Sequence, residues 1–125
     1  MKKFLIFTTM CFMIAIYTGC YYDKADQIYL PTTINCDTTN LKYGTDINAI
    51  LNTYCNSCHG GNASLGGGIK LDTYASLLPY VNNGLLLNDI EQNPGFNAMP
   101  KGGAKLSDCV INKIAAWIKN TAPNN

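Results

Sequence analysis

Residues 55–59 read Cys55-Asn56-Ser57-Cys58-His59, so two thiols and an imidazole lie within five consecutive positions. On a helical turn, side chains three residues apart lie on the same face, which brings the two sulfur atoms together. The imidazole follows directly after the second thiol. His59 is the only histidine among the 125 residues. A ligand bound at this turn would therefore meet two sulfur atoms and one ring nitrogen.

The C-x-x-C-H pattern is typical of covalent c-type haem attachment. Cys55 and Cys58 are spaced to form thioethers with the two vinyl groups of one porphyrin, and His59 would then be the proximal iron ligand. A thioredoxin-like dithiol is one alternative, but it needs a βαβ context that this chain lacks. Half of a zinc site is the other, but zinc needs four ligands, and Cys36 and Cys109 stand alone in the sequence. We predict one covalently bound haem c as the cofactor.

The distal iron ligand is predicted by elimination. His59 has no second histidine to pair with, and Met99 follows it by 40 residues within a stretch, 93–103, that is rich in Pro and Gly and predicts a loop. Pro100 restricts the backbone beside the thioether. A methionine that only fills a gap in the core fits such a polar loop poorly. We predict Met99 as the distal ligand, with a lysine or a tyrosine as the alternative.

Ligation by His59 and Met99 bears on function. A methionine ligand raises the reduction potential relative to more basic ligands, and six-coordinate iron has no vacant position for a substrate. The chain is therefore predicted to carry electrons, cycling between Fe(III) and Fe(II), and not to be an enzyme. Two alternatives remain open: an electron-donating haem subunit of a larger oxidoreductase complex, and a haem-based gas sensor with a labile distal ligand.

Helical periodicity surrounds these ligands. Apolar residues recur at helical spacing from Thr45, a suitable N-cap, up to the 55–59 motif, and again from the N-cap Ser107 to the stop at Pro123. Shorter helices are predicted over 72–81, with Asp72 as the cap, and over 85–91. Asn83-Gly84 between them is compatible with a β-hairpin, although we favour a turn between two helices.

Three segments of the chain resemble monohaem class I c-type cytochromes, over about residues 43–122. They are the haem motif, the distal loop Asn97-Ala98-Met99-Pro100-Lys101-Gly102-Gly103, and the closing helix with Leu106-Ser107-Asp108 and Ile114-Ala115-Ala116-Trp117-Ile118. The resemblance implies an all-α, cytochrome c-like fold of three to five short helices wrapped round one covalently bound haem. That family often orients its proximal histidine with a proline carbonyl. Here the corresponding stretch reads Gly66-Gly67-Gly68-Ile69, which leaves the acceptor for His59 Nδ1 open.

Apolar residues outside the motif are candidates for the haem pocket wall or, equally, for ordinary helix–helix core, because periodicity does not separate the two. Tyr80 or Tyr54 is a candidate partner for a haem propionate. The candidate wall residues are Leu71, Tyr74, Leu77, Leu78, Leu86, Ile90, Phe96, Leu106 and Trp117.

The N-terminus has the features of an export signal. Lys2 and Lys3 precede an uncharged, mostly apolar run of 14 residues, 4–17, which is short of the ~20 residues that span a membrane. Gly19 before Cys20 resembles a bacterial lipoprotein signal, in which the cysteine is lipidated. We predict a lipoprotein signal peptide over 1–19, an extended tether over 20–43 and a cytochrome c domain over 44–125. A plain secretory signal is the alternative.

The remaining cysteines are predicted to pair. Cys20 is assigned to lipid, and Cys55 and Cys58 are assigned to haem. Cys36 and Cys109 are left, and an exported protein meets an oxidising compartment, which predicts a disulfide between them. Two separate free thiols are the alternative.

Charge limits the range of partners. The formal net charge is +1, which excludes a strongly basic nucleic-acid surface. Loss of residues 1–19 removes two of the nine lysines and leaves seven against eight acidic residues. The predicted partners are a redox protein of unknown identity and, through Cys20, a membrane. The predicted location is the bacterial cell envelope, facing the periplasm or the outer surface.

Overall fold

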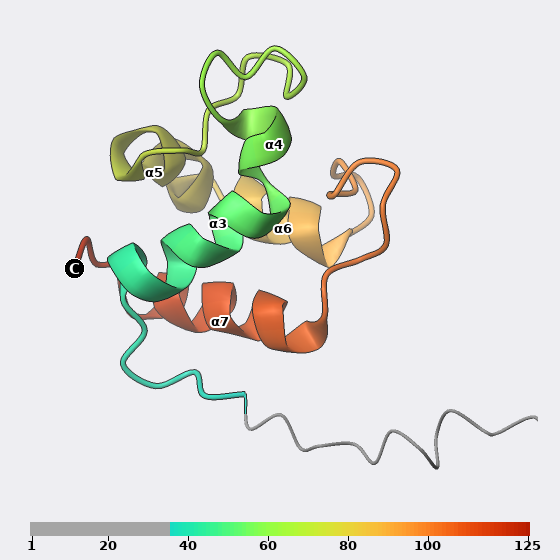
Figure 1. Cartoon of the computed structure of the whole chain (residues 1–125). Helices are drawn as coiled ribbons and strands as arrows, with labels where there is room; N and C mark the ends of the chain where they lie inside the picture. The colour runs from blue at the N-terminus through green and yellow to red at the C-terminus, as the bar shows by residue number, and fades with distance from the viewer. Residues whose placement is uncertain (1–35) are drawn as a thin grey trace, which may run out of the picture. The chain divides into compact units, whose positions relative to one another are not determined.

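The computed structural model describes residues 36–125, which form one compact unit. Its helices are η2 (Tyr43–Ile47), α3 (Asn48–Tyr54), α4 (Asn56–His59), α5 (Tyr74–Asn82), α6 (Leu85–Glu91) and α7 (Asp108–Lys119). Because η2 runs directly into α3, these segments make five short helices, and residues 36–125 contain no strand (Figure 1). The predicted all-α fold is confirmed. The proposed signal peptide, Cys20 and the tether up to residue 35 lie outside the described residues.

The helix starts agree in part with the sequence. Ser107 caps α7 by accepting a hydrogen bond from the Val110 N–H, as predicted. Helix α5 is capped by Thr73, which forms a capping box with Ser76, so the prediction of Asp72 as the cap was wrong. The Asp72 carboxylate instead accepts a hydrogen bond from the Gly61 N–H at 2.9 Å. Asp72, the residue before the cap, thus holds the loop that contains Gly61 in place.

The first helix also starts differently from the prediction. It begins at Tyr43, so Thr45 lies inside the first turn and is not the N-cap. The free N–H groups of that turn find partners at the other end of the sequence, because Asn125 accepts from Tyr43 through Oδ1 (3.0 Å) and from Gly44 through its carbonyl (2.9 Å). This contact holds the C-terminal segment against η2 and satisfies donors that a helix end leaves unpaired.

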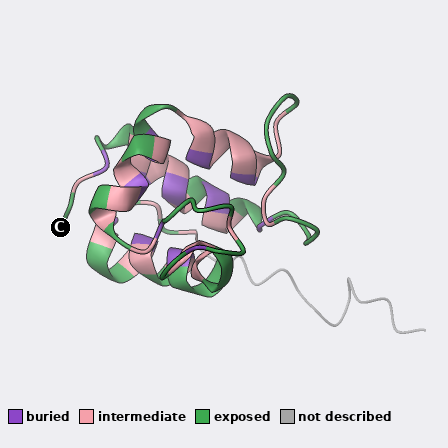
Figure 2. Ribbon diagram, turned by 90° about the horizontal axis from the view of Figure 1, so that it is seen from above, coloured by how far each residue is buried: buried purple, intermediate pink, exposed green. Residues whose placement is uncertain are grey.

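The core is formed by buried side chains of η2, α3, α5, α6 and α7. Figure 2 shows the buried residues on the helix faces that turn toward one another. Trp117 is 1% exposed and its ring lies 6.0 Å from that of Tyr43, while its Nε1–H donates to the Pro123 carbonyl at 3.0 Å. Burial of this ring is therefore compatible with its polar N–H. The largest fully buried side chains are Trp117, Ile47, Leu51, Leu77 and Ile114.

A disulfide joins Cys36 to Cys109 in the first turn of α7, as predicted, with 5.5 Å between the two Cα atoms. It closes a loop across a sequence separation of 73. In the chain-entropy model a loop of this length stabilises the fold by about 4 kcal/mol. Within residues 36–125, no helix combines the length and the apolar character needed to cross a membrane.

Candidate haem site

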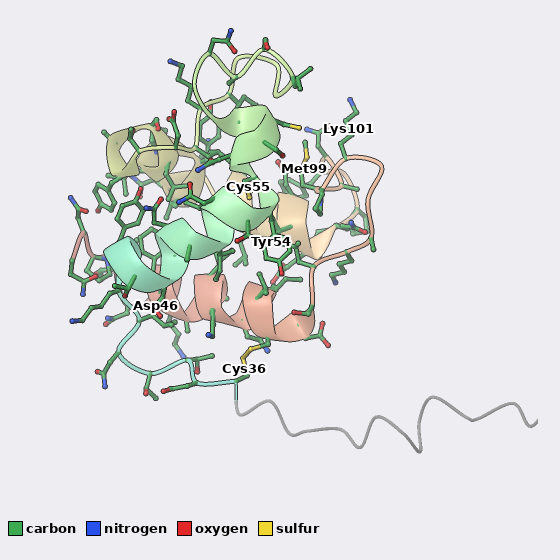
Figure 3. The ribbon with its side chains drawn as sticks, viewed as in Figure 1. Cys36, Asp46, Tyr54, Cys55, Met99 and Lys101 are labelled. Carbon is green, nitrogen blue, oxygen red and sulfur yellow. A yellow bond between two sulfur atoms is a disulfide. The ribbon has the colours of Figure 1, made fainter. Side chains whose placement is uncertain are left out.

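The four predicted haem ligands line one cavity of about 370 Å³. Cys55, Cys58 and His59 come from the α3–α4 junction, and Met99 comes from the loop before α7. In Figure 3, Cys55 and Met99 lie above α7, whereas Cys36 lies below it. The fold thus brings together two segments that are 40 residues apart in sequence, on the side of α7 away from the disulfide.

His59 is held at both its ring and its backbone. Its Nδ1 lies 2.9 Å from the carbonyl oxygen of Ile69, and its own carbonyl accepts from the Leu71 N–H at 2.9 Å. Because a carbonyl only accepts hydrogen bonds, Nδ1 carries a proton, and in the neutral imidazole the lone pair is then on Nε2. The acceptor that the sequence left open is therefore Ile69. This arrangement fixes the tautomer and the ring orientation that a metal-binding histidine needs.

Gly66 is the residue that lets the chain pass this close to His59. A Cβ at position 66 would lie 2.5 Å from His59 Nδ1 and 2.7 Å from the Cys58 carbonyl oxygen. Both distances are far inside van der Waals contact, so a larger residue requires the loop or the imidazole to move. Residues 66–68 are three consecutive glycines, and the sequence alone does not distinguish between them. The structure shows that Gly66 has a specific steric role in the placement of His59.

The two motif cysteines differ in environment. Cys55 is half-buried, and burial raises the pKa of its thiol to about 11. Cys58 is exposed, and neither residue forms a disulfide. At neutral pH the Cys55 sulfur is therefore a neutral thiol, as suits a residue directed toward an apolar wall.

Met99 lies on a loop that hydrogen-bonds to the end of α6. Its N–H donates to the Asp89 carbonyl at 3.0 Å, and its carbonyl accepts from Gln92 Nε2 at 3.3 Å. The side chain is partly buried and packs against the hydrophobic core. The peptide groups on both sides of Met99 are therefore held by the same helix end, which limits where the thioether can go.

The rest of the predicted wall divides into two groups. Of the residues proposed for it, those that line the cavity are Leu71, Leu86, Ile90 and Leu106. Tyr54 and Tyr80, the candidate partners of a haem propionate, also line it. The proposed wall residues that do not line it are Tyr74, Leu77, Leu78, Phe96 and Trp117. Leu77 and Trp117 belong to the buried core, Phe96 is 43% exposed, and the Tyr74 hydroxyl donates to the Ala122 carbonyl.

Sequence analysis missed several residues of the cavity. Leu85 and Asp89 lie one helical turn apart on α6, beside Leu86 and Ile90. Their i, i+4 spacing was a signal that could have placed them on the same face. Leu65 and Ile69 come from the glycine-rich loop, where no periodicity exists to place them.

The residues around the cavity fit a covalently attached haem. Two thiols, an imidazole with its Nε2 lone pair available and a thioether share one space with four buried leucine and isoleucine side chains. The volume is within the usual range for cofactor pockets. In the described part of the chain, no three His, Cys, Asp or Glu side chains lie together as a metal-ion site, so Cys55 and Cys58 have no such partners there for zinc.

Comparison with known proteins agrees with this chemistry. The sequence model of the family described as "Cytochrome C oxidase, cbb3-type, subunit III" matches residues 44–118, a span that includes the C-x-x-C-H motif and Met99. No curated protein and no solved structure gives a significant match. A cytochrome c domain of this kind implies haem-based electron transfer and is typically not itself catalytic. The chain belongs to the cbb3-type cytochrome c oxidase subunit III family of cytochrome c domains.

Proposed function

We propose that this protein is a monohaem class I c-type cytochrome that transfers single electrons. Cys55 and Cys58 attach the haem, His59 is the proximal iron ligand and Met99 is the distal ligand. The observation that carries the proposal is that these four side chains line one cavity, although Met99 is remote from the others in sequence. When bound there, haem c supplies a one-electron Fe(III)/Fe(II) couple.

The residues of the chain explain why electron transfer is favoured over catalysis. His59 presents Nε2 because the Ile69 carbonyl holds the proton on Nδ1. Met99 would supply a second protein ligand to the iron, which would leave no coordination position for a substrate. Leu71, Leu86 and other buried side chains give the cavity an apolar inner wall. An apolar wall has few polar groups that would need to reorient when the charge of the haem iron changes.

The rim of the cavity provides a route for the electron. Leu65 is 79% exposed, Tyr54 is 44% exposed and Ile69 is 36% exposed, and all three line the cavity. Apolar side chains at an open mouth allow a partner protein to approach without displacing the ligands. The physiological partner is therefore proposed to be a redox protein that docks transiently at this rim.

We also propose that the protein is exported and anchored in the bacterial cell envelope by lipid on Cys20, facing the periplasm or the outer surface. The basic and then apolar sequence of residues 1–19 supports export. The Cys36–Cys109 disulfide is consistent with an oxidising compartment. Cys20→Ser tests the anchor, because the variant is expected in the soluble fraction. Retention in the membrane fraction would contradict lipidation of Cys20.

The family name favours one second candidate, a haem subunit that feeds electrons to a larger oxidoreductase complex. Affinity purification of the full chain from its native membranes discriminates between the two. A stoichiometric oxidase or dehydrogenase in the eluate indicates a subunit, whereas isolation of the chain alone indicates a mobile carrier.

The haem itself is tested by expression in a host that attaches c-type haem. The expected product is coloured, gives a pyridine haemochrome spectrum for two thioether bonds, and has an intact mass greater than the polypeptide by one haem. A variant with Cys55→Ala and Cys58→Ala is the matched control and is expected to lose the covalent haem. A colourless wild-type product with the mass of the polypeptide alone would refute the proposal.

A further inference from the structure

The loop that carries Met99 has little support of its own. A turn from Phe96 N–H to the Asn93 carbonyl precedes residues 97–99, and a turn from Gly103 N–H to the Pro100 carbonyl follows them. Asn97 is exposed. The loop therefore depends on outside contacts to keep the thioether directed at the cavity.

Asp89, in the last turn of α6, supplies two of these contacts. Its carboxylate Oδ1 accepts from the Asn97 N–H at 2.9 Å, and its carbonyl oxygen accepts from the Met99 N–H at 3.0 Å. One residue thus binds the backbone on both sides of Ala98. In the described residues, Asp89 is the only hydrogen-bond partner of these two N–H groups.

The base of this contact is rigid. On α6, Leu86 is 6% exposed and Ile90 is 3% exposed, and both line the cavity together with Asp89. The helix whose buried face lines the cavity is therefore the same helix that the Met99 loop is bonded to. Gln92, which follows α6, adds its 3.3 Å hydrogen bond to the Met99 carbonyl.

We propose that Asp89 is the positioning residue for the distal ligand, and that its carboxylate holds the Met99 loop over the cavity by binding the Asn97 N–H. This inference rests on the proposed role of Met99 as an iron ligand. Loss of the carboxylate acceptor frees residue 97, so the loop samples positions in which the thioether is away from the iron. External ligands then compete more easily for the distal position.

The negative charge of Asp89 offers a different explanation, because a carboxylate at the cavity also stabilises a cationic centre electrostatically. Two substitutions separate the hydrogen bond from the charge. Asp89→Asn removes the charge and keeps an Oδ1 acceptor in the same place. Asp89→Ala removes both the charge and the acceptor. Glu91→Ala is the matched control, since it removes another carboxylate from α6. The Glu91 carboxylate accepts a hydrogen bond from Asn93 and makes none with residues 97–99.

The experiment measures imidazole binding to the ferric, haem-loaded full chain, together with the reduction potential and the charge-transfer band of the iron–thioether bond. Loss of the hydrogen bond from the Asn97 N–H predicts about a tenfold gain in imidazole affinity and a weaker band for Asp89→Ala. Asp89→Asn and Glu91→Ala are expected to stay within about twofold of wild type. Asp89→Leu, which keeps the branched shape at Cγ and has no acceptor, replaces Asp89→Ala if that variant does not load haem, and the same tenfold gain is expected.

Unchanged imidazole affinity in Asp89→Ala or Asp89→Leu would overturn the proposal, and so would an equal gain in Asp89→Asn, which would assign the effect to charge. Met99→Ala tests the assignment of Met99 as the iron ligand separately from the positioning role of Asp89. If Met99 is the ligand, this variant binds imidazole much more tightly, and adding Asp89→Ala to it changes nothing further. If Met99→Ala leaves the spectrum and the affinity unchanged, the ligand assignment itself fails and the positioning role fails with it.

Discussion

Gly66→Ala is expected to disturb the proximal side of the haem site without altering any ligand. The new Cβ would lie 2.5 Å from His59 Nδ1 and 2.9 Å from Cε1. Carbon and nitrogen atoms favour a separation of about 3.5 Å, so the imidazole or the loop must shift by about 1 Å. Such a shift stretches the 2.9 Å hydrogen bond from Nδ1 to the Ile69 carbonyl.

The magnitude follows from two effects. Overpacking a tight site costs about 1–3 kcal/mol. Weakening one hydrogen bond of this type costs about 1 kcal/mol. The free energy of unfolding of the haem-loaded Gly66→Ala protein is therefore expected to fall by about 2–4 kcal/mol. Because the bond from Nδ1 makes the imidazole a stronger donor to iron, its weakening should also raise the reduction potential.

The free energy of unfolding is measured by denaturant titration. Unfolding is followed by haem absorbance and by the fluorescence of Trp117, the single tryptophan. The reduction potential is measured by spectroelectrochemical titration. Gly44→Ala is the matched control, because its Cβ would lie 3.4 Å from the Asn125 carbonyl oxygen, an ordinary contact remote from the cavity. Its unfolding free energy should change by less than about 0.5 kcal/mol. If Gly66→Ala is as stable as this control and keeps the wild-type potential, the steric reasoning is wrong.

Two further predictions concern the part of the fold remote from the cavity. The double variant Cys36→Ala, Cys109→Ala should have a free energy of unfolding lower by up to about 4 kcal/mol, and by less if bound haem already restrains the unfolded chain. Its reduction potential should be unchanged. A shifted potential would show that the disulfide influences the haem site. The Lys42 N–H, which bonds to the Asp46 carboxylate at 3.0 Å, holds the pKa of that carboxyl below its usual value. The resulting stability is present above about pH 4 and is lost as the pH falls through the lowered pKa, so the advantage of wild type over Asp46→Asn in unfolding free energy should shrink between pH 5 and pH 3. A pH-independent difference between these two proteins would contradict the assignment.

Local patterns were sufficient for much of the molecule. The helix over 85–91 lies where the sequence placed it, as α6. The cap at Ser107 was visible because a side chain and the turn it caps are neighbours in sequence. The pairing of Cys36 with Cys109 followed from counting the cysteines that had no other role. Each of these inferences used residues or counts that required no knowledge of how the helices pack.

The errors and omissions involve residues that meet only after packing. Asn125 satisfies N–H groups in the first turn of η2 from the other end of the described chain, and no local pattern could have revealed this partner of Tyr43. Leu77 and Trp117 have the same apolar periodicity as the residues of the cavity wall, yet they face the helix–helix core. Periodicity identifies the inner face of a helix and does not identify what lies opposite that face.

The amino-acid sequence alone determined the chemistry of this protein: one imidazole, two thiols a turn apart, and one thioether in the chain after the proposed signal. The tertiary structure decided how that chemistry is held. It selected the Ile69 carbonyl as the acceptor for His59, required a glycine at position 66, and joined the Met99 loop to Asp89. The reason is physical. The identity of a donor atom is a property of its own residue, whereas its orientation depends on neighbours that folding brings from elsewhere in the chain.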